Sequence, residues 1–140
     1  MTAFLLSVHV IAAILTVGPV AVAASMFPAA QRADPGGAVA RILHRICRVY
    51  AVIGIIVPVF GVATGASLGV LGDAWLIVSM VLTALAAAVL IWGILPAQAA
   101  ALGGADRPRL AMSAGVFNLL WAIVVVLMIV RPGSTTGAGL

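Results

Sequence analysis

The chain has 140 residues, of which 65% are hydrophobic and only 7% are charged, whereas a soluble domain carries roughly 45–50% apolar and about 25% charged residues. Its charged residues are seven arginines and three aspartates, too few to cover a water-soluble globule. This composition excludes a soluble enzyme, a nucleic-acid-binding domain and a disordered chain, and a net charge of +4 is too small to signal nucleic acid as a partner. It predicts one domain in a lipid bilayer.

Four apolar stretches are long enough to cross a hydrocarbon core of roughly 30 Å. They cover about residues 3–29, 45–68, 75–102 and 110–130. No stretch alternates polar and apolar residues, so helices are the spanning structure that satisfies the backbone. The fold class predicted is all-α: a four-helix transmembrane bundle over residues 1–131, with a flexible extracytoplasmic tail over residues 132–140.

The first stretch holds His9, and an ionisable residue at membrane depth is a candidate functional residue. Met80 and Met128 are expected at a similar depth in the outer half of the bundle. One imidazole and two thioethers suit copper(I), and a His with one Met suits haem b. The alternative, which needs no cofactor and is the first expectation, is a neutral His bonded across the bundle beside two gap-filling methionines.

The three aspartates are expected at helix N-termini, where a carboxylate caps free N–H groups and favours the helix dipole. Asp34 precedes Pro35 before the second stretch, Asp73 precedes the third, and Asp106 precedes the fourth. This assignment leaves no carboxylate within a span.

The second stretch begins with basic residues that share one helix face, because they recur at i, i+3, i+4 and i+7: Arg41, His44, Arg45 and Arg48. This face could bind anionic lipid headgroups or an acidic partner. It could equally be an anchor whose side chains extend to the headgroups without binding anything specific.

Small residues follow in the same stretch, where Gly61, Gly65 and Gly69 are spaced by four. Such a stripe lets two helices approach closely. Two uses stay open: packing inside the bundle, or a face for a second copy or a larger membrane complex. Pro19, Pro58 and Pro96 lie within the first three stretches, and each is expected to kink its helix.

Arginine placement predicts the orientation. Six arginines lie near the two links that join spans one to two and three to four, and only Arg131 lies on the other side. The positive-inside rule therefore predicts both termini outside. Cys47 is the only cysteine, so no intramolecular disulfide can form.

The residues indicate no enzyme, because no catalytic motif or pair of carboxylates occurs. The leading hypothesis is a small integral membrane protein that acts through helix association, as a homo-oligomer or in a larger complex. The first alternative is a haem- or copper(I)-binding protein that uses His9. The second is a small transporter subunit, favoured by the prolines and by a faint repeat between residues 28–31 and 96–99.

Several short motifs extend over nearly the whole chain: Ser7-Val8-His9-Val10 with Gly18, Thr64-Gly65, Trp75, and the segment 128–133. With its motifs in this order, the chain resembles a bacterial family of four-span integral membrane proteins of unknown function. That family is similar, distantly, to the membrane domain of the copper-resistance protein CopD and to small haem-binding membrane oxidases. The resemblance implies copper or haem binding through a histidine in a span, which points to His9. It also implies a location in a bacterial cytoplasmic (inner) membrane.

Overall fold

The computed structural model describes residues 2–133, and every secondary-structure element within that range is helical. The elements are α1 (Thr2–Ala33), α2 (Ala38–Ile53), α3 (Ile56–Leu68), α4 (Ala74–Ala88), the π-helix η1 (Val89–Ile94), α5 (Leu95–Leu102) and α6 (Leu110–Val130). They form four apolar helical stretches long enough to cross a membrane. The all-α, multi-pass fold predicted from composition is confirmed. Most of the expected tail, residues 134–140, lies outside the described range.

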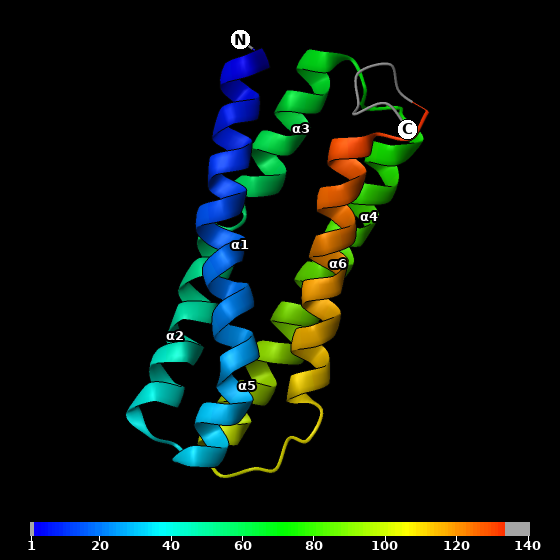
Figure 1. Cartoon of the computed structure of the whole chain (residues 1–140). Helices are drawn as coiled ribbons and strands as arrows, with labels where there is room; N and C mark the ends of the chain where they lie inside the picture. The colour runs from blue at the N-terminus through cyan, green and yellow to red at the C-terminus, as the bar shows by residue number, and fades with distance from the viewer. Residues whose placement is uncertain (1, 134–140) are drawn as a thin grey trace.

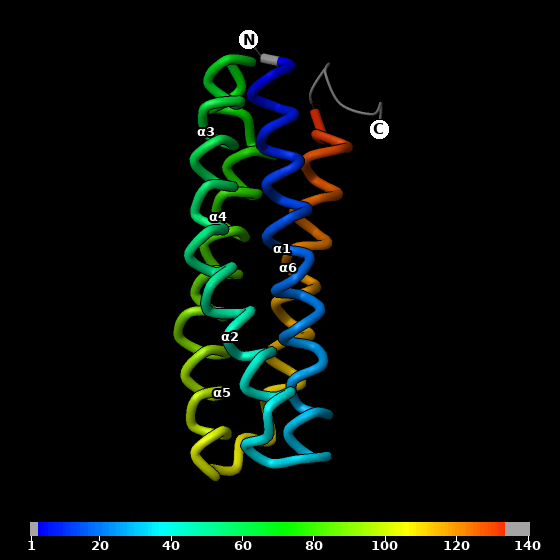
Figure 2. Tube along the Cα trace, turned by 90° about the vertical axis from the view of Figure 1, so that its left-hand side faces the viewer, coloured from blue at the N-terminus to red at the C-terminus, as the bar shows by residue number. Residues whose placement is uncertain are grey.

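The helices form two hairpins (Figures 1 and 2). In the first, α1 packs along α2 and α3, and in the second, α4 and η1 pack along α6. The hairpins meet mainly where α1 contacts α6 and where α2 contacts α5. The α1–α2 turn and the α5–α6 loop lie together at one end of the molecule (Figure 1). We call it the arginine end, because six of the seven arginines lie at it or in the helices that start there.

The main core lies toward the arginine end, where small residues let the helices approach closely. Its largest members with almost no exposed surface are Phe27, Cys47 and Ile94, and the same cluster includes Ala40, Ala86 and Ala114. A second, small cluster of Val70, Trp75 and Leu76 closes the opposite end. Many large apolar side chains outside the two clusters are exposed, as expected of helices whose solvent is lipid.

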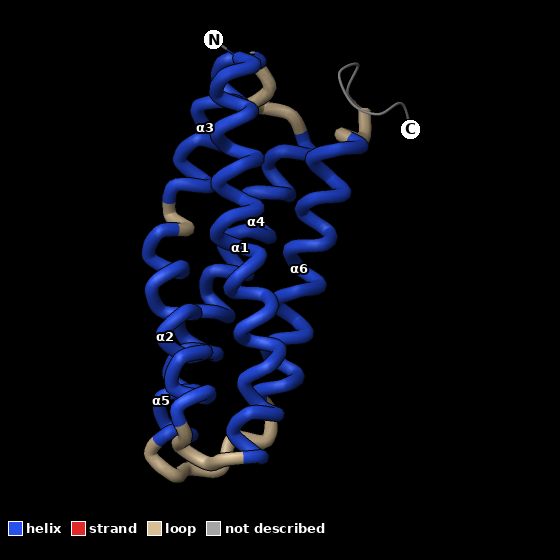
Figure 3. The backbone as a smooth tube through the Cα atoms, turned by 60° about the vertical axis from the view of Figure 1, so that its left-hand side comes forward, coloured by secondary structure: helices blue, strands red, loops and turns tan. Residues whose placement is uncertain are grey.

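The second span is broken between α2 and α3, at Gly54 and Ile55 (Figure 3). Pro58 has no N–H to donate to the carbonyl of Gly54, and its ring would clash with that carbonyl in a regular helix. The carbonyl of Gly54 instead accepts the N–H of Val57, and Ile55 donates to Val52. Both bonds join residues three apart, so the helix tightens and changes direction here.

The third span contains a different irregularity, also next to a proline. Leu95 donates its N–H to Leu90, five residues back, at the end of η1. Pro96 follows directly and has no N–H for a regular bond, so the wider π turn lies where the helical ladder is already interrupted. α1, by contrast, continues through Pro19 without interruption.

The expected aspartate caps are correct at one helix of three. Asp73 is the N-cap of α4, although its side chain caps no N–H and instead accepts the Trp75 Nε1–H at 3.1 Å. The other two predictions are wrong, because α2 has Gly37 and α6 has Arg109 at the N-cap. Gly36 adopts φ +69°, so the chain turns once more after Pro35 before α2 begins.

Candidate functional site

A cavity of about 120 Å³ lies between the two hairpins, and we call it the mid-bundle cavity. Its lining comes from all four spans, mostly as apolar side chains. The lining residues are Thr16, Val17, Val20, Tyr50, Ala51, Gly54, Ile55, Pro58, Thr83, Ala87, Leu90, Ile91, Phe117 and Trp121. The cavity therefore depends on how the hairpins pack together.

Both interrupted stretches of helix border this cavity. Gly54, Ile55 and Pro58 contribute the break between α2 and α3, and Leu90 and Ile91 contribute η1. Non-helical backbone within a membrane is tolerated where it is buried in protein or lines a cavity. Discontinuous helices that face each other are also how many transporters build a binding site near the bilayer centre.

Trp121 carries a strong hydrogen-bond donor that is buried and lacks a partner among the described residues. Its Nε1 atom is buried and makes no hydrogen bond with any described residue. Thr16 and Thr83 donate their hydroxyls to carbonyls of their own helices, Ala12 and Ser79, at 2.6 and 2.7 Å. A buried N–H without a partner costs about 1–3 kcal/mol, so Trp121 needs an explanation. The Oδ1 atom of Asn118, one turn earlier in α6 and outside the lining, is the other buried side-chain atom without a partner among the described residues.

His9 lies nearer the end of the bundle at which α1 begins. Its Nδ1 atom is 2.8 Å from the carbonyl oxygen of Val57 in α3. A carbonyl only accepts, so Nδ1 carries the proton and Nε2 is the free ring nitrogen. A Cβ atom on Gly61 would lie 2.9 Å from the His9 Cε1 atom. His9 thus occupies a space that the glycine leaves open.

The His9 ring has the orientation that metal-ligating histidines adopt, with the second nitrogen bonded to a carbonyl. The two methionines do not complete a site. Met80 is 44% exposed on the outside of α4, a helix that α1 scarcely contacts. Met128 packs against the Val70, Trp75 and Leu76 cluster. The residues present therefore do not fit the expected copper(I) or haem set.

The glycine stripe serves several purposes. Gly61 faces His9, as described, and a Cβ atom on Gly65 would lie 3.0 Å from Leu76 and 3.1 Å from Leu71. Both glycines therefore lie at close contacts inside this bundle. Gly69 ends α3 in the left-handed conformation, at φ +72°. The three residues that were candidates for a partner face have structural roles within one chain.

The basic group at the start of α2 separates into two parts. Arg41, Arg45 and Arg48 are exposed, and among the described residues they make no ion pair. His44 instead turns into the bundle, where its Nδ1 atom is 2.8 Å from the Oε1 atom of Gln98. Gln98 is fully buried and also donates to the Cys47 sulfur at 3.6 Å. His44 thus joins α2 to α5.

Sequence reasoning missed Trp121 and Gln98. A signal existed for Gln98, because an uncharged amide near the end of an apolar stretch needs partners. Trp121 carried no such signal, since tryptophan is common at lipid-facing and buried positions alike. Comparison with models of known families, with curated proteins and with solved structures found no match. The functional argument therefore comes from the chain's own residues.

Proposed function

We propose that this membrane protein binds a small, mostly apolar molecule that carries a hydrogen-bond acceptor, in the mid-bundle cavity. The observation that carries the proposal is the buried, unpartnered Nε1–H of Trp121, a residue that lines that cavity. An acceptor on the ligand would satisfy this N–H and remove its desolvation cost. A membrane protein with this activity is a small transporter subunit or a carrier of membrane-dissolved ligands.

The size and chemistry of the cavity define the ligand class. Its volume of about 120 Å³ is comparable with the roughly 150 Å³ engineered cavity that takes up benzene. The lining contains no charged residue, so an ion would lose its hydration without compensation. A ketone, ester or ether with one ring or a short chain meets both conditions.

The lipid is the route by which such a molecule would reach the cavity. Ile55, Pro58, Ala87 and Ile91 line it and are also exposed on the outside of the bundle. Ile55 and Pro58 lie at and just after the break in the second span, and Ala87 and Ile91 lie in α4 and η1 of the third span. A molecule already dissolved in the bilayer could pass between the hairpins at this rim without crossing a polar surface.

Thermal unfolding of the purified protein in mild detergent tests the proposal. Cyclohexanone, at concentrations that saturate the site, should raise the unfolding midpoint by about 2–4 °C. Methylenecyclohexane has the same shape without the acceptor and should stabilise much less. Ala51→Leu, which fills the cavity, should abolish the difference between the two probes. Ala111→Leu, on the exposed face of α6, is the control that should keep it. Equal stabilisation by both probes would sink the proposal.

Association with a second copy is the other candidate function, and Gly115 favours it. Gly115 is exposed in the first third of α6, and a Cβ atom there would meet nothing within 4 Å. Unlike Gly61, it makes no close contact inside the bundle. If α6 pairs with α6 of a second copy, Gly115→Leu should reduce in-membrane crosslinking of the protein, and Gly18→Leu, at an exposed glycine of α1, should not.

A further inference from the structure

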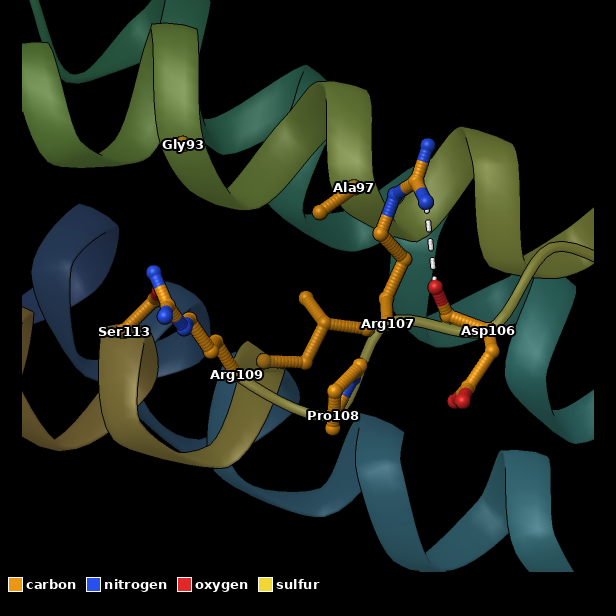
Figure 4. A pocket seen from close by; sticks show the side chains of 8 residues that line it. Gly93, Ala97, Asp106, Arg107, Pro108, Arg109 and Ser113 are labelled. Carbon is orange, nitrogen blue, oxygen red and sulfur yellow. Dashed lines mark hydrogen bonds between the residues drawn. The ribbon is translucent and has the colours of Figure 1, made fainter.

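A second recess lies at the arginine end, between α5 and the start of α6 (Figure 4). Its volume is about 300 Å³, larger than that of the mid-bundle cavity. The lining residues are Gly93, Ala97, Asp106, Arg107, Pro108, Arg109, Leu110 and Ser113. We call it the interfacial recess, because its walls extend from the apolar third span to the polar α5–α6 loop.

The polar wall carries two positive charges. Arg107 donates to the backbone carbonyl of Asp106 at 3.0 Å, and neither this arginine nor Arg109 makes an ion pair within residues 2–133. Figure 4 shows the Arg107 side chain reaching back toward α5 beside Ala97, whereas the carboxylate of Asp106 points the other way. Ser113 lies one turn after Arg109, on the same face of α6. Figure 4 shows the Arg109 side chain extending away from Arg107, toward Ser113, so the recess has one guanidinium group at each side and a hydroxyl beside Arg109.

The opposite wall is apolar and lies deeper. Gly93 belongs to η1 and Ala97 to α5, both within the third membrane span, and Leu110 is buried at the start of α6. A soluble anion makes no use of such a wall. A phospholipid does, because its phosphate lies at the membrane surface while its glycerol and first methylene groups lie in the hydrocarbon.

We propose that the interfacial recess binds the phosphodiester headgroup of an anionic phospholipid. Arg107 and Arg109 contact the phosphate oxygens, with Ser113 as a further donor, since guanidinium groups recognise phosphate through paired hydrogen bonds. The glycerol and upper acyl chain lie against Gly93 and Ala97. This site is separate from the exposed arginines of α2 and independent of the ligand proposed for the mid-bundle cavity.

Native mass spectrometry of the detergent-solubilised protein tests the site, with phosphatidylglycerol and phosphatidylcholine as probes. The wild type should retain one phosphatidylglycerol in preference to phosphatidylcholine. The double variant Arg107→Gln/Arg109→Gln should bind it about 30-fold more weakly. Arg41→Gln/Arg45→Gln removes the same charge from the same end and should change binding no more than about threefold. Equal losses in the two double variants would overturn the site in favour of diffuse attraction.

Two further binding experiments test the identity of the ligand and the role of the recess. Ala97→Phe fills the apolar wall and leaves both arginines in place, so it should also lose the lipid, and retained binding would contradict the proposal. Glycerol 3-phosphate carries the phosphate without acyl chains and should not displace phosphatidylglycerol at equal concentration. Displacement would show a site for soluble phosphate and overturn the lipid assignment. Unfolding midpoints without lipid check that each variant is folded.

Discussion

At the scale of single residues, the contact between His9 and Gly61 shows how the first hairpin is held together. The imidazole of α1 donates to the Val57 carbonyl of α3 and occupies the volume that a side chain at position 61 would fill. A hydrogen bond of this kind contributes about 0.6 kcal/mol between membrane helices. The close approach of the two helices therefore matters at least as much as the bond itself.

This contact predicts opposite effects for the same substitution at two glycines. Gly115→Ala should stabilise the protein by up to about 1 kcal/mol, because alanine favours a helix and its Cβ meets nothing. Gly61→Ala should destabilise it by about 1–2 kcal/mol, because its Cβ would lie 2.9 Å from the His9 ring. Both free energies of unfolding can be measured by denaturant titration in micelles.

The His9→Ala background supplies the control for this pair. With the imidazole removed, Gly61→Ala should no longer clash and should stabilise the protein, as Gly115→Ala does. A Gly61→Ala variant that destabilises equally with and without the imidazole would show that the glycine is required for another reason.

The residues that sequence reasoning could identify were those whose chemistry is unusual in a membrane. His9 stood out because an ionisable group in a span needs a partner, but its partner is a backbone carbonyl 48 positions away, which no side-chain pattern encodes. Met80 was grouped with His9 by depth alone, and depth does not define the direction in which a side chain points. Trp121 is distinguished by its unpartnered N–H, which depends on the tertiary packing and which no sequence pattern encodes.

At the scale of elements, the helix breaks give the bundle its cavity. Sequence reasoning expected kinks at Pro19, Pro58 and Pro96, and the structure interrupts the helix near the last two. A proline removes one hydrogen bond in every case, and whether the helix then breaks depends on packing around the freed carbonyl. At Pro58 a glycine lies four residues earlier, and its carbonyl turns to Val57.

Pro58→Ala should restore the regular hydrogen bond to Gly54 and straighten the second span. The Gly54 and Ile55 part of the cavity lining would then move, so the stabilisation by cyclohexanone should fall to less than half that of the wild type. Thermal unfolding with and without the probe measures this. Pro28→Ala in α1, remote from the cavity lining, should bind as the wild type does, and an unchanged response in Pro58→Ala would contradict the account.

At the scale of the whole molecule, composition and span length were enough to predict a four-helix membrane bundle, because no other fold could bury this sequence. Which faces meet was not predictable, since nearly every face is apolar and lipid offers no contrast between inside and outside. The cavity and the interfacial recess both arise from those faces. The same ambiguity explains why the glycine stripe could not be assigned to internal packing from spacing alone.

The arginine end is expected to lie in the cytoplasm, following the positive-inside rule. Gly72 and Ala105 are exposed in the links at opposite ends of the bundle, and each can be replaced by cysteine. A membrane-impermeant maleimide should label Gly72→Cys in intact cells and Ala105→Cys only after permeabilisation. The wild type is the control, because Cys47 is buried. The reverse pattern would invert the orientation.

Recognition of a ligand by the Trp121 N–H in the mid-bundle cavity can be followed through the indole signals in a ¹H–¹⁵N spectrum. The other two tryptophans are internal controls, since the Trp75 N–H is bonded to Asp73 and Trp92 is 77% exposed on the outer surface. During a cyclohexanone titration, the Trp121 signal should shift and saturate while the other two stay in place. A Trp121 signal that does not move, or three signals that drift together without saturation, would contradict this recognition.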